Sequence, residues 1–190
     1  MVVLDACAYQ IKGSGRVSEA PLDAGAPFAV VTWFDAGIDV STSSVGSFKD
    51  LEASCDPCQR SGNIFYALRL DGLFKSVRTR AVNPPKVGMG LVGAAKTQSE
   101  FTFTDREGTL VGLWSPGFSS AFSVAGYHFH FLSADRQHGG HLLDVAADVL
   151  RLQVEALTDF HLALPESEAF LKADLSKNTT EQLAYGEKAH

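Results

Sequence analysis

The strictest constraint on the fold of this 190-residue chain comes from residues 126–131, whose sequence is Gly-Tyr-His-Phe-His-Phe. Successive side chains of a β-strand leave opposite faces of the sheet. In a strand, His128 and His130 therefore share one face, while Phe129 and Phe131 share the other. The alternation predicts a β-strand that presents two imidazoles side by side.

His141 comes after this segment, beyond a polar run at residues 133–137 and a Gly-Gly pair. Glycines permit a tight return of the chain, which can bring a third imidazole beside the first two. Three protein nitrogens and one open position form the ligand pattern of a catalytic zinc site, whereas a closed structural site needs a fourth ligand. An H-x-H pair alone more often belongs to packed or surface histidines, but the third histidine makes His128, His130 and His141 predicted metal ligands. Imidazole also suits iron, copper and nickel, so these residues do not by themselves identify the metal.

Charge and hydropathy limit the classes of partner. The formal net charge is −6 and the sequence has no basic stripe, which argues against nucleic acid or an anionic membrane as a partner. No apolar run approaches the ~20 residues of a membrane-spanning helix. The first seven residues lack a basic region and include Asp5 within an apolar stretch, so they do not resemble a signal peptide. We therefore expect a cytoplasmic protein.

The three cysteines are an odd number, which argues against a framework of disulfides. Cys55 and Cys58 have C-x-x-C spacing, but a redox pair requires the N-terminus of a helix and these residues come after a predicted short helix. A zinc ribbon would need a second pair. We interpret both as loop cysteines without a chemical role.

Strand patterns dominate the rest of the chain, with short helices at its periphery. This composition predicts an α+β fold with mixed or antiparallel sheets in one domain spanning residues 1–190. The predicted strands are a hairpin over residues 2–12 and 17–21, strands at 27–34 and 37–44, a hairpin of 64–72 and 74–82 around an Asp-Gly turn, 101–104 and 109–114 around a turn, the ligand strand at 121–131, one long strand at 141–156 and an edge strand at 160–164. The predicted helices are residues 47–54 with Ser47 as N-cap, 90–97, 166–171 and 180–187.

Several runs resemble motifs of the bacterial-type α-acetolactate decarboxylase family, in the same order and over essentially the whole chain. They are residues 63–75 (NIFYALRLDGLFK, family N-x-F-Y-A-I-R-I-D-G-x-F-K), 77–80 (VRTR, family V-x-T-R), 108–112 with 115–116 (family G-T-x-V-G-F-x-T/S-P), and 126–131 with 139–144 (family G-Y-H-L-H-F and G-G-H-V-x-D).

The resemblance implies zinc held by His128, His130 and His141, and a homodimer that converts α-acetolactate to acetoin. The family's active-site arginine falls on Arg80, and its C-terminal active-site glutamate falls on Glu187; Glu166 and Glu168 are weaker candidates because they match a variable stretch. Zinc would act as a Lewis acid, Arg80 would orient the substrate carboxylate, and Glu187 would handle a proton.

The chain departs from the family in two places. The family carries N-terminal strands with a G-T-F-x-x-L-D-G-E motif whose glutamate belongs to the active site. Residues 1–5 match only the family residues just after that glutamate, so we expect those strands to be missing. Residues 83–88 replace a family Q-x-K-P-Y pattern close to Arg80. Two alternatives to the decarboxylase therefore stay open: a zinc-binding domain without enzymatic activity, and an inactive truncated homologue. Residues 63–75 and Arg80 favour the decarboxylase over the zinc-binding domain.

Overall fold

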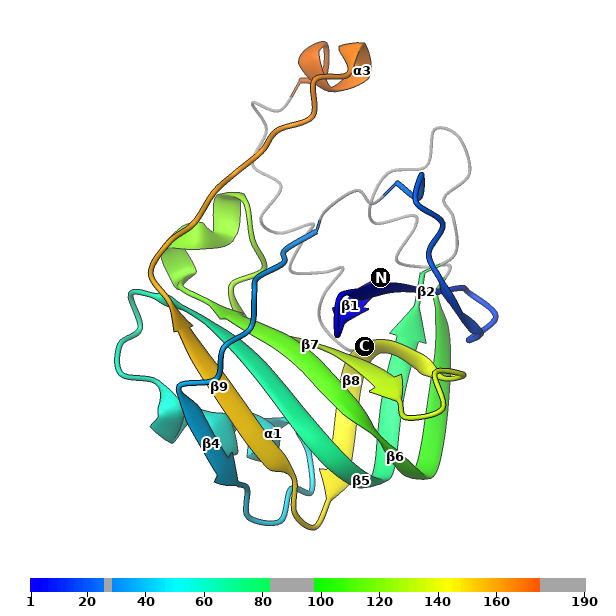
Figure 1. The fold of residues 1–190 in the computed structure, drawn as a ribbon, viewed down its shortest axis with the longest axis vertical. Coiled ribbons are helices and arrows are strands. Elements are labelled where there is room, and N and C mark those ends of the chain that lie inside the picture. The colour runs from blue at the N-terminus through cyan, green and yellow to red at the C-terminus, as the bar shows by residue number, and fades with distance from the viewer. Residues whose placement is uncertain (26–28, 83–97, 175–190) are drawn as a thin grey trace.

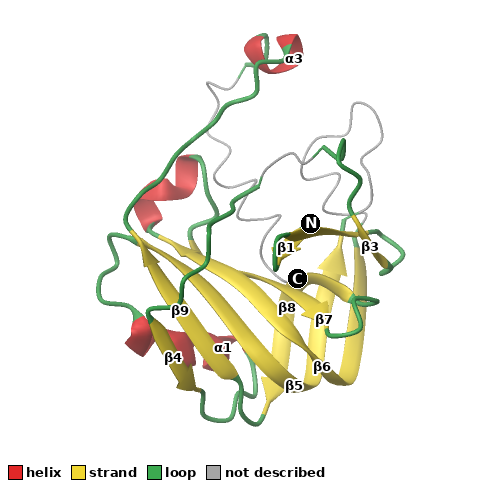
Figure 2. Ribbon diagram, viewed as in Figure 1, coloured by secondary structure: helices red, strands yellow, loops and turns green. Residues whose placement is uncertain are grey.

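A computed structural model describes residues 1–25, 29–82 and 98–174. Within these ranges the chain forms a three-stranded and a six-stranded sheet, both antiparallel, with a few short helices (Figures 1 and 2). The predicted α+β class is therefore confirmed. No helix among the described residues has the length and apolar character needed to cross a membrane.

The small sheet contains β1 (Val2–Leu4), β2 (Cys7–Ile11) and β3 (Val17–Glu19) in that order. The predicted hairpin is confirmed for β2 and β3, but its predicted first strand at residues 2–12 is divided into β1 and β2 by a turn. Asp5 and Ala6 connect β1 to β2 in a two-residue turn, and both have positive φ, at 52° and 62°. This is the backbone of a type I′ turn, whose twist matches that of the flanking strands. The Asp5 carboxylate accepts a hydrogen bond from Arg69 at 3.0 Å and so ties the small sheet to the large one.

The large sheet closes partly on itself. Its six strands are β4 (Ile38–Ser41), β5 (Phe65–Ala81), β6 (Ser99–Ser115), β7 (Gly126–Ser133), β8 (Gly139–Ala147) and β9 (Arg151–Leu157). Its strand β8 pairs with β7 on one side and with the second half of β5 on the other, so β5, β6, β7 and β8 form a closed path. The first half of β5 pairs instead with β9, which carries the edge strand β4.

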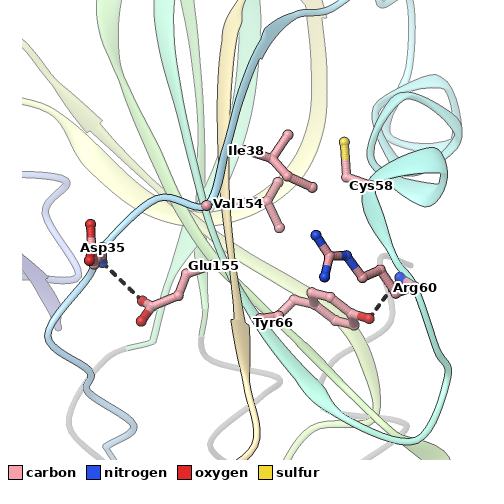
Figure 3. Close-up of a pocket in the computed structure, with 9 residues that line it drawn as sticks. Asp35, Ile38, Cys58, Arg60, Tyr66, Val154 and Glu155 are labelled. Carbon is pink, nitrogen blue, oxygen red and sulfur yellow. Dashed lines mark hydrogen bonds between the residues drawn. The ribbon is translucent and has the colours of Figure 1, made fainter.

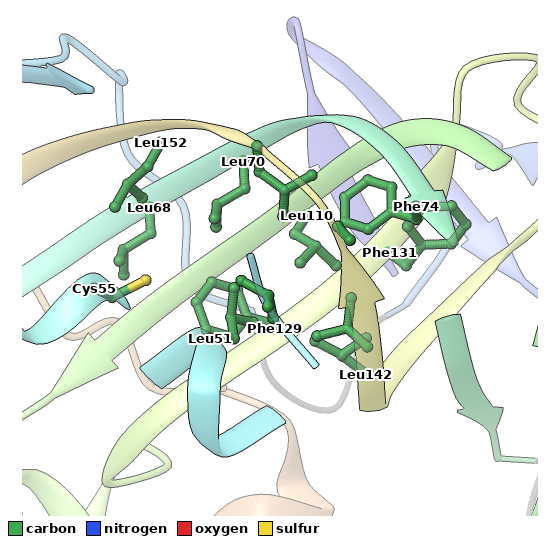
Figure 4. Packing of buried hydrophobic residues seen from close by; sticks show 14 of the residues in the cluster. Leu51, Cys55, Leu68, Leu70, Phe74, Leu110, Phe129, Phe131, Leu142 and Leu152 are labelled. Atoms are coloured by element: carbon green, nitrogen blue, oxygen red, sulfur yellow. The ribbon is translucent and has the colours of Figure 1, made fainter. Parts of the chain in front are cut away.

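The hydrophobic core lies inside this curved sheet and beneath helix α1 (Phe48–Cys55), as Figure 4 shows. Phe129 and Phe131 are fully buried there, and burial of each side chain contributes about 1.5–3 kcal/mol. The predicted helix at residues 47–54 is confirmed with its cap, because the Ser47 side chain accepts from the N–H of Asp50. The other described helices are η1 (Asp56–Cys58), η2 (Gly117–Ala121) and α3 (Glu168–Leu171).

Two predicted turns are wrong, because β5 and β6 each run for 17 residues without a break. The Asp-Gly pair at residues 71–72 and the run at 105–108 lie within strands. A Cβ at Gly72 would lie 2.8 Å from Cδ2 of Leu150, and one at Gly108 would lie 2.6 Å from the ring of Phe131. These glycines permit close packing against residues of neighbouring chain segments, which is the other common reason for glycine in a strand.

Other strand boundaries also differ from the prediction. The expected strand at 141–156 is two strands, β8 and β9, that reverse through residues 148–150. No strand forms at 160–164 or over the described part of 27–34, where Trp33 is 91% exposed. The ligand strand begins at Gly126 because residues 117–121 form η2. The strand at 37–44 is confirmed as β4 and the helix at 166–171 as α3, while the predicted helices at 90–97 and 180–187 lie outside the described residues.

Candidate metal centre

Strand β7 has the two faces that its alternation predicts. Phe129 and Phe131 point into the core with no exposed surface, and His128 and His130 leave the opposite face half-buried. The imidazoles of His128 and His130 bring their Nε2 atoms to 3.0 Å from each other. The strand alone therefore supplies two adjacent nitrogen ligands.

His141 joins them because it lies directly across from His130 in the pairing of β7 with β8. The chain reverses between these strands through residues 134–138, where the N–H of Ser133 donates to the carbonyl of His138. The two glycines before His141 lie within β8 and not in the return. A Cβ at Gly140 would lie 2.7 Å from Cβ of Thr79, so glycine here lets β8 approach β5 closely.

The three imidazoles converge on one point. Their ring centroids are 4.7, 5.1 and 5.4 Å apart, and one nitrogen from each ring lies within 4.8 Å of the others. Two nitrogens bound to a tetrahedral zinc ion, each at about 2.0–2.1 Å from it, are roughly 3.3–3.4 Å apart. The nitrogens of His128, His130 and His141 are therefore close enough to one another to share a single ion.

Electrostatics keep His130 and His141 in the form that binds metal. Burial lowers the pKa of His130 well below its ordinary value, and the positive charges of His128, the Met1 amino group and Arg80 lower it further. Burial also lowers the pKa of His141, with contributions from His130, His128 and Arg80. A neutral imidazole keeps the lone pair that a metal ion requires, so both rings are prepared for coordination at neutral pH.

Arg80 lies in one row with His141 and His130, because the three residues are directly opposite one another on neighbouring strands. It is directly across from His141 in the pairing of β5 with β8, and His141 is in turn across from His130. Directly opposite residues in a sheet point to the same face, with Cβ atoms about 4.5–5.5 Å apart. Arg80 is only 4% exposed, and its Nη1 donates to Oε1 of Gln98 at 3.0 Å. Its neighbour on that face, Arg78, is more exposed and lies 3.5 Å from Glu100.

The predicted carboxylates are not brought to this row within the described residues. Glu187 lies outside them. Glu166 is exposed, and Glu168 begins helix α3, where its carboxylate accepts from Nζ of Lys172 at 2.9 Å.

The predicted loop location of the C-x-x-C cysteines is wrong. Cys55 is the buried last residue of α1, and Cys58 ends the short helix η1. Burial raises the pKa of Cys55 to about 12, and the nearby Cys58 adds to the shift. Burial also raises the pKa of Cys58. Both thiols therefore stay protonated at neutral pH, a state that neither binds metal nor attacks disulfides.

Tyr127 is a residue beside the site that sequence patterns do not single out. Its hydroxyl donates to Oδ1 of Asp56 at 2.9 Å and accepts from Nε2 of Gln59 at 2.7 Å. Its ring stacks on Phe129, with centroids 5.8 Å apart. Tyr127 therefore anchors β7 to η1 immediately before His128. The only sequence signal is its period-2 relation to Phe129, which says nothing of its partners.

The chain resembles proteins of one family over most of its length. The family model described as "Alpha-acetolactate decarboxylase" matches residues 1–177. The alpha-acetolactate decarboxylase of Brevibacillus brevis is 34% identical over 94% of this chain and 63% of its own length, and that of Methylococcus capsulatus is 37% identical over 96% and 71%.

A crystal structure of alpha-acetolactate decarboxylase from Bacillus subtilis strain 168 has a similar fold. The match has a TM-score of 0.92 and 29% sequence identity, and covers 97% of this chain and 80% of that one. The chain thus spans roughly two thirds of the length of its curated relatives, at 63% of the B. brevis protein and 71% of the M. capsulatus protein. These similarities, together with the histidine site, show that the chain belongs to the alpha-acetolactate decarboxylase family.

Proposed function

We propose that this chain decarboxylates α-acetolactate to acetoin. The reaction uses one divalent metal ion, which we expect to be zinc, bound by His128, His130 and His141. The observation that carries the proposal is the convergence of three imidazole nitrogens within 4.8 Å of one another in a member of this family. Three nitrogen ligands leave a tetrahedral ion one open position for substrate. When bound, zinc would supply Lewis acidity to the oxygens of the substrate's ketone and hydroxyl groups.

Arg80 is the proposed group that orients the substrate. Its guanidinium is buried beside His141, in surroundings where a charged hydrogen bond is stronger than in water. A guanidinium can donate two parallel hydrogen bonds to the carboxylate that is lost as carbon dioxide, which an ammonium group cannot do. Fixing this carboxylate aligns the breaking carbon–carbon bond with the ketone that accepts its electron pair.

The reaction also needs a proton at the carbon that lost the carboxylate. Glu187 is the proposed donor, by the family resemblance alone. Its replacement by Gln should slow turnover by about 10²-fold or more, as is usual on loss of a proton-transfer group. Unchanged turnover in Glu187→Gln refutes the role.

Arg80 offers a sharper test. Arg80→Lys keeps the charge and removes the paired donors, so acetoin formation should fall by about 10²-fold, while zinc content stays at the wild-type level. Arg78→Lys is the matched control, because Arg78 lies on the same strand face and is more exposed. Equal losses in the two variants would contradict a specific role for Arg80.

The shorter length of the chain keeps a second candidate open, a zinc-binding domain without enzymatic activity, whether a dedicated binding module or an inactive homologue. The comparison that separates them is acetoin formation by this chain and by a version that also carries the family's N-terminal segment, each with and without a chelator. Turnover by this chain supports the decarboxylase, whereas turnover by the longer version alone supports an inactive truncated homologue. Metal binding without turnover in both supports the second candidate. The homodimer, the single domain and the cytoplasmic location stay predictions.

A further inference from the structure

A cavity of about 290 Å³ lies at the edge strands β4 and β9 of the large sheet (Figure 3). Strands β5 and β6 separate β9 from the ligand strand β7, and no metal ligand belongs to the lining of the cavity. Val154 and Glu155 both line it, but they are consecutive in β9 and leave opposite faces of the sheet. The residues that meet a substrate at the histidines lie instead on the sheet face around them.

Strand β6 presents an apolar pair of side chains beside the histidines. Val111 is directly opposite His130 in the pairing of β6 with β7, and Leu113 is directly opposite His128. Such pairs share a face of the sheet, with Cβ atoms about 4.5–5.5 Å apart. Gly112, between them, faces the core, because a Cβ there would overlap the ring of a core phenylalanine. Val111 and Leu113 are half-buried, so both keep apolar surface that a ligand can cover.

Arg80 borders the histidines on the opposite side from this apolar pair. The row of directly opposite residues runs from β5 to β6 through Arg80, His141, His130 and Val111. A ligand over the imidazoles therefore has a guanidinium at one end and an aliphatic surface at the other. The aliphatic end favours an alkyl group, because it offers a carboxylate no hydrogen bonds to replace those from water.

A second arginine lies beyond the aliphatic end. Arg69, on the first half of β5, is directly opposite Val111. Its guanidinium donates to the carboxylates of Asp71 at 2.8 Å and Asp5 at 3.0 Å. Because two carboxylates already occupy these donors, Arg69 competes weakly with Arg80 for the carboxylate of a ligand. The two ends of the row thus differ in the group that they accept.

The substrate of the proposed reaction carries both kinds of group on one carbon. Carbon 2 of α-acetolactate is tetrahedral and bears a hydroxyl group, an acetyl group, a carboxylate and a methyl group. In the proposed function the hydroxyl and ketone oxygens lie over the imidazoles and the carboxylate lies at Arg80. The methyl group then leaves carbon 2 in a direction away from Arg80, toward β6.

We infer that Val111 and Leu113 contact the alkyl group on carbon 2 of the substrate and limit its length, an inference that rests on the proposed function. A methyl group lies against the two side chains, whereas a propyl group has to displace them. Packing of additional carbon atoms against well-placed side chains is unfavourable. Replacement of Leu113 by alanine removes most of its side chain and makes room for the longer group.

The test compares a methyl with a propyl substituent in a ligand that cannot react. 2,3-Dihydroxy-2-methylbutanoate and its 2-propyl homologue have a hydroxyl group in place of the ketone, so neither loses carbon dioxide. Isothermal titration into the full chain with one equivalent of zinc gives the ratio of their dissociation constants. In the wild-type chain the propyl compound should bind at least about tenfold more weakly. Leu113→Ala should remove most of this difference, and Val111→Ala should reduce it by a smaller factor.

Leu157→Ala is the matched control, because Leu157 is a half-buried leucine on the same face of the sheet, at the end of β9 and two strands from β6. It should leave the ratio at the wild-type value. Equal binding of the two compounds by the wild-type chain would overturn the inference. So would a ratio that stays unchanged in both Leu113→Ala and Val111→Ala, or one that changes as much in Leu157→Ala.

The same proteins separate this inference from the proposed function. Acetoin formation tests the decarboxylation, whereas binding of the unreactive pair tests the contacts with the alkyl group. Ratios that shift as expected without any acetoin support the contacts and contradict decarboxylation by this chain. Acetoin formation with unchanged ratios contradicts the contacts alone. No heat of binding for the methyl compound up to about 10 mM also overturns the inference, since contacts of this kind should give a Kd of about 1 mM or below.

Discussion

The two faces of strand β7 have different roles, one in packing the core and one in the predicted metal site, although their residues alternate along one chain segment. Phe129 and Phe131 have no exposed surface and pack in the core, whereas His128 and His130 are half-buried on the other face and converge with His141. The packed face positions the imidazoles because the strand cannot shift its register without exposing both phenylalanines. Substitutions on the inner face should therefore change the free energy of unfolding, and those on the outer face should change metal binding.

The largest expected effect is on the inner face. Phe131→Ala should lower the free energy of unfolding by about 3–5 kcal/mol, because it leaves a cavity in the core. Urea denaturation of the metal-free protein measures this change. Phe118→Ala is the matched control, since Phe118 is 65% exposed and its loss should cost less than about 1 kcal/mol. Similar losses in the two variants would contradict the division between the faces.

On the outer face, His141→Ala should weaken zinc binding by about 10²- to 10³-fold, roughly the share of one ligand in a site with three. A competition titration with a chromophoric chelator measures the affinity. The free energy of unfolding of the metal-free protein should change far less than in Phe131→Ala, because the imidazole is only half-buried. A wild-type zinc affinity in this variant would show that His141 is not a ligand.

The pH dependence of stability should also separate the faces. The pKa values of His130 and His141 are lowered in the folded state, so below about pH 6.5 the unfolded chain takes up protons that the folded one does not. The stability of the metal-free protein should therefore be fully present above about pH 6.5 and decline as the pH falls toward the folded pKa values. Thermal unfolding between about pH 7.5 and pH 5.5 tests this. His130→Gln with His141→Gln should flatten the decline, and His161→Gln, at an exposed position, should not.

The smallest expected effect concerns the turn that joins β1 to β2. Ala6 has a φ of 62°, a conformation that costs a residue with a Cβ about 1–2 kcal/mol and costs glycine little. Ala6→Gly should therefore raise the free energy of unfolding by about 1 kcal/mol without changing zinc affinity. Ala8→Gly, within β2, is the control and should lower stability by about 0.5–1 kcal/mol. A loss of stability in Ala6→Gly would contradict the turn described above.

Local patterns predict the parts of the site that depend on local geometry. The period-2 alternation at residues 126–131 is sufficient to assign the faces of β7, and the spacing to His141 is sufficient to expect a third imidazole beside them. Arg80 is different, because its position beside His141 depends on the pairing of β5 with β8, which joins segments some 60 residues apart. Only the family resemblance points to it.

The wrong predictions of turns at Gly72 and Gly108 and of a strand at residues 27–34 have a common physical cause. Local patterns place Gly72 and Gly108 in turns, but these glycines are required by side chains of Leu150 and Phe131 that approach from outside their own strands. Residues 29–34 have strand composition, yet no neighbouring strand pairs with them among the described residues. In each case the deciding partner is distant in sequence, so a local pattern cannot reveal it.

The most direct test of the central claim is acetoin formation by metal-stripped protein before and after addition of one equivalent of zinc, in the wild-type chain and in His128→Ala. The three-imidazole site predicts no activity without metal, recovery on addition of zinc to the wild-type chain, and no recovery in the variant. Activity that persists without metal, or that zinc restores equally in His128→Ala, would contradict it.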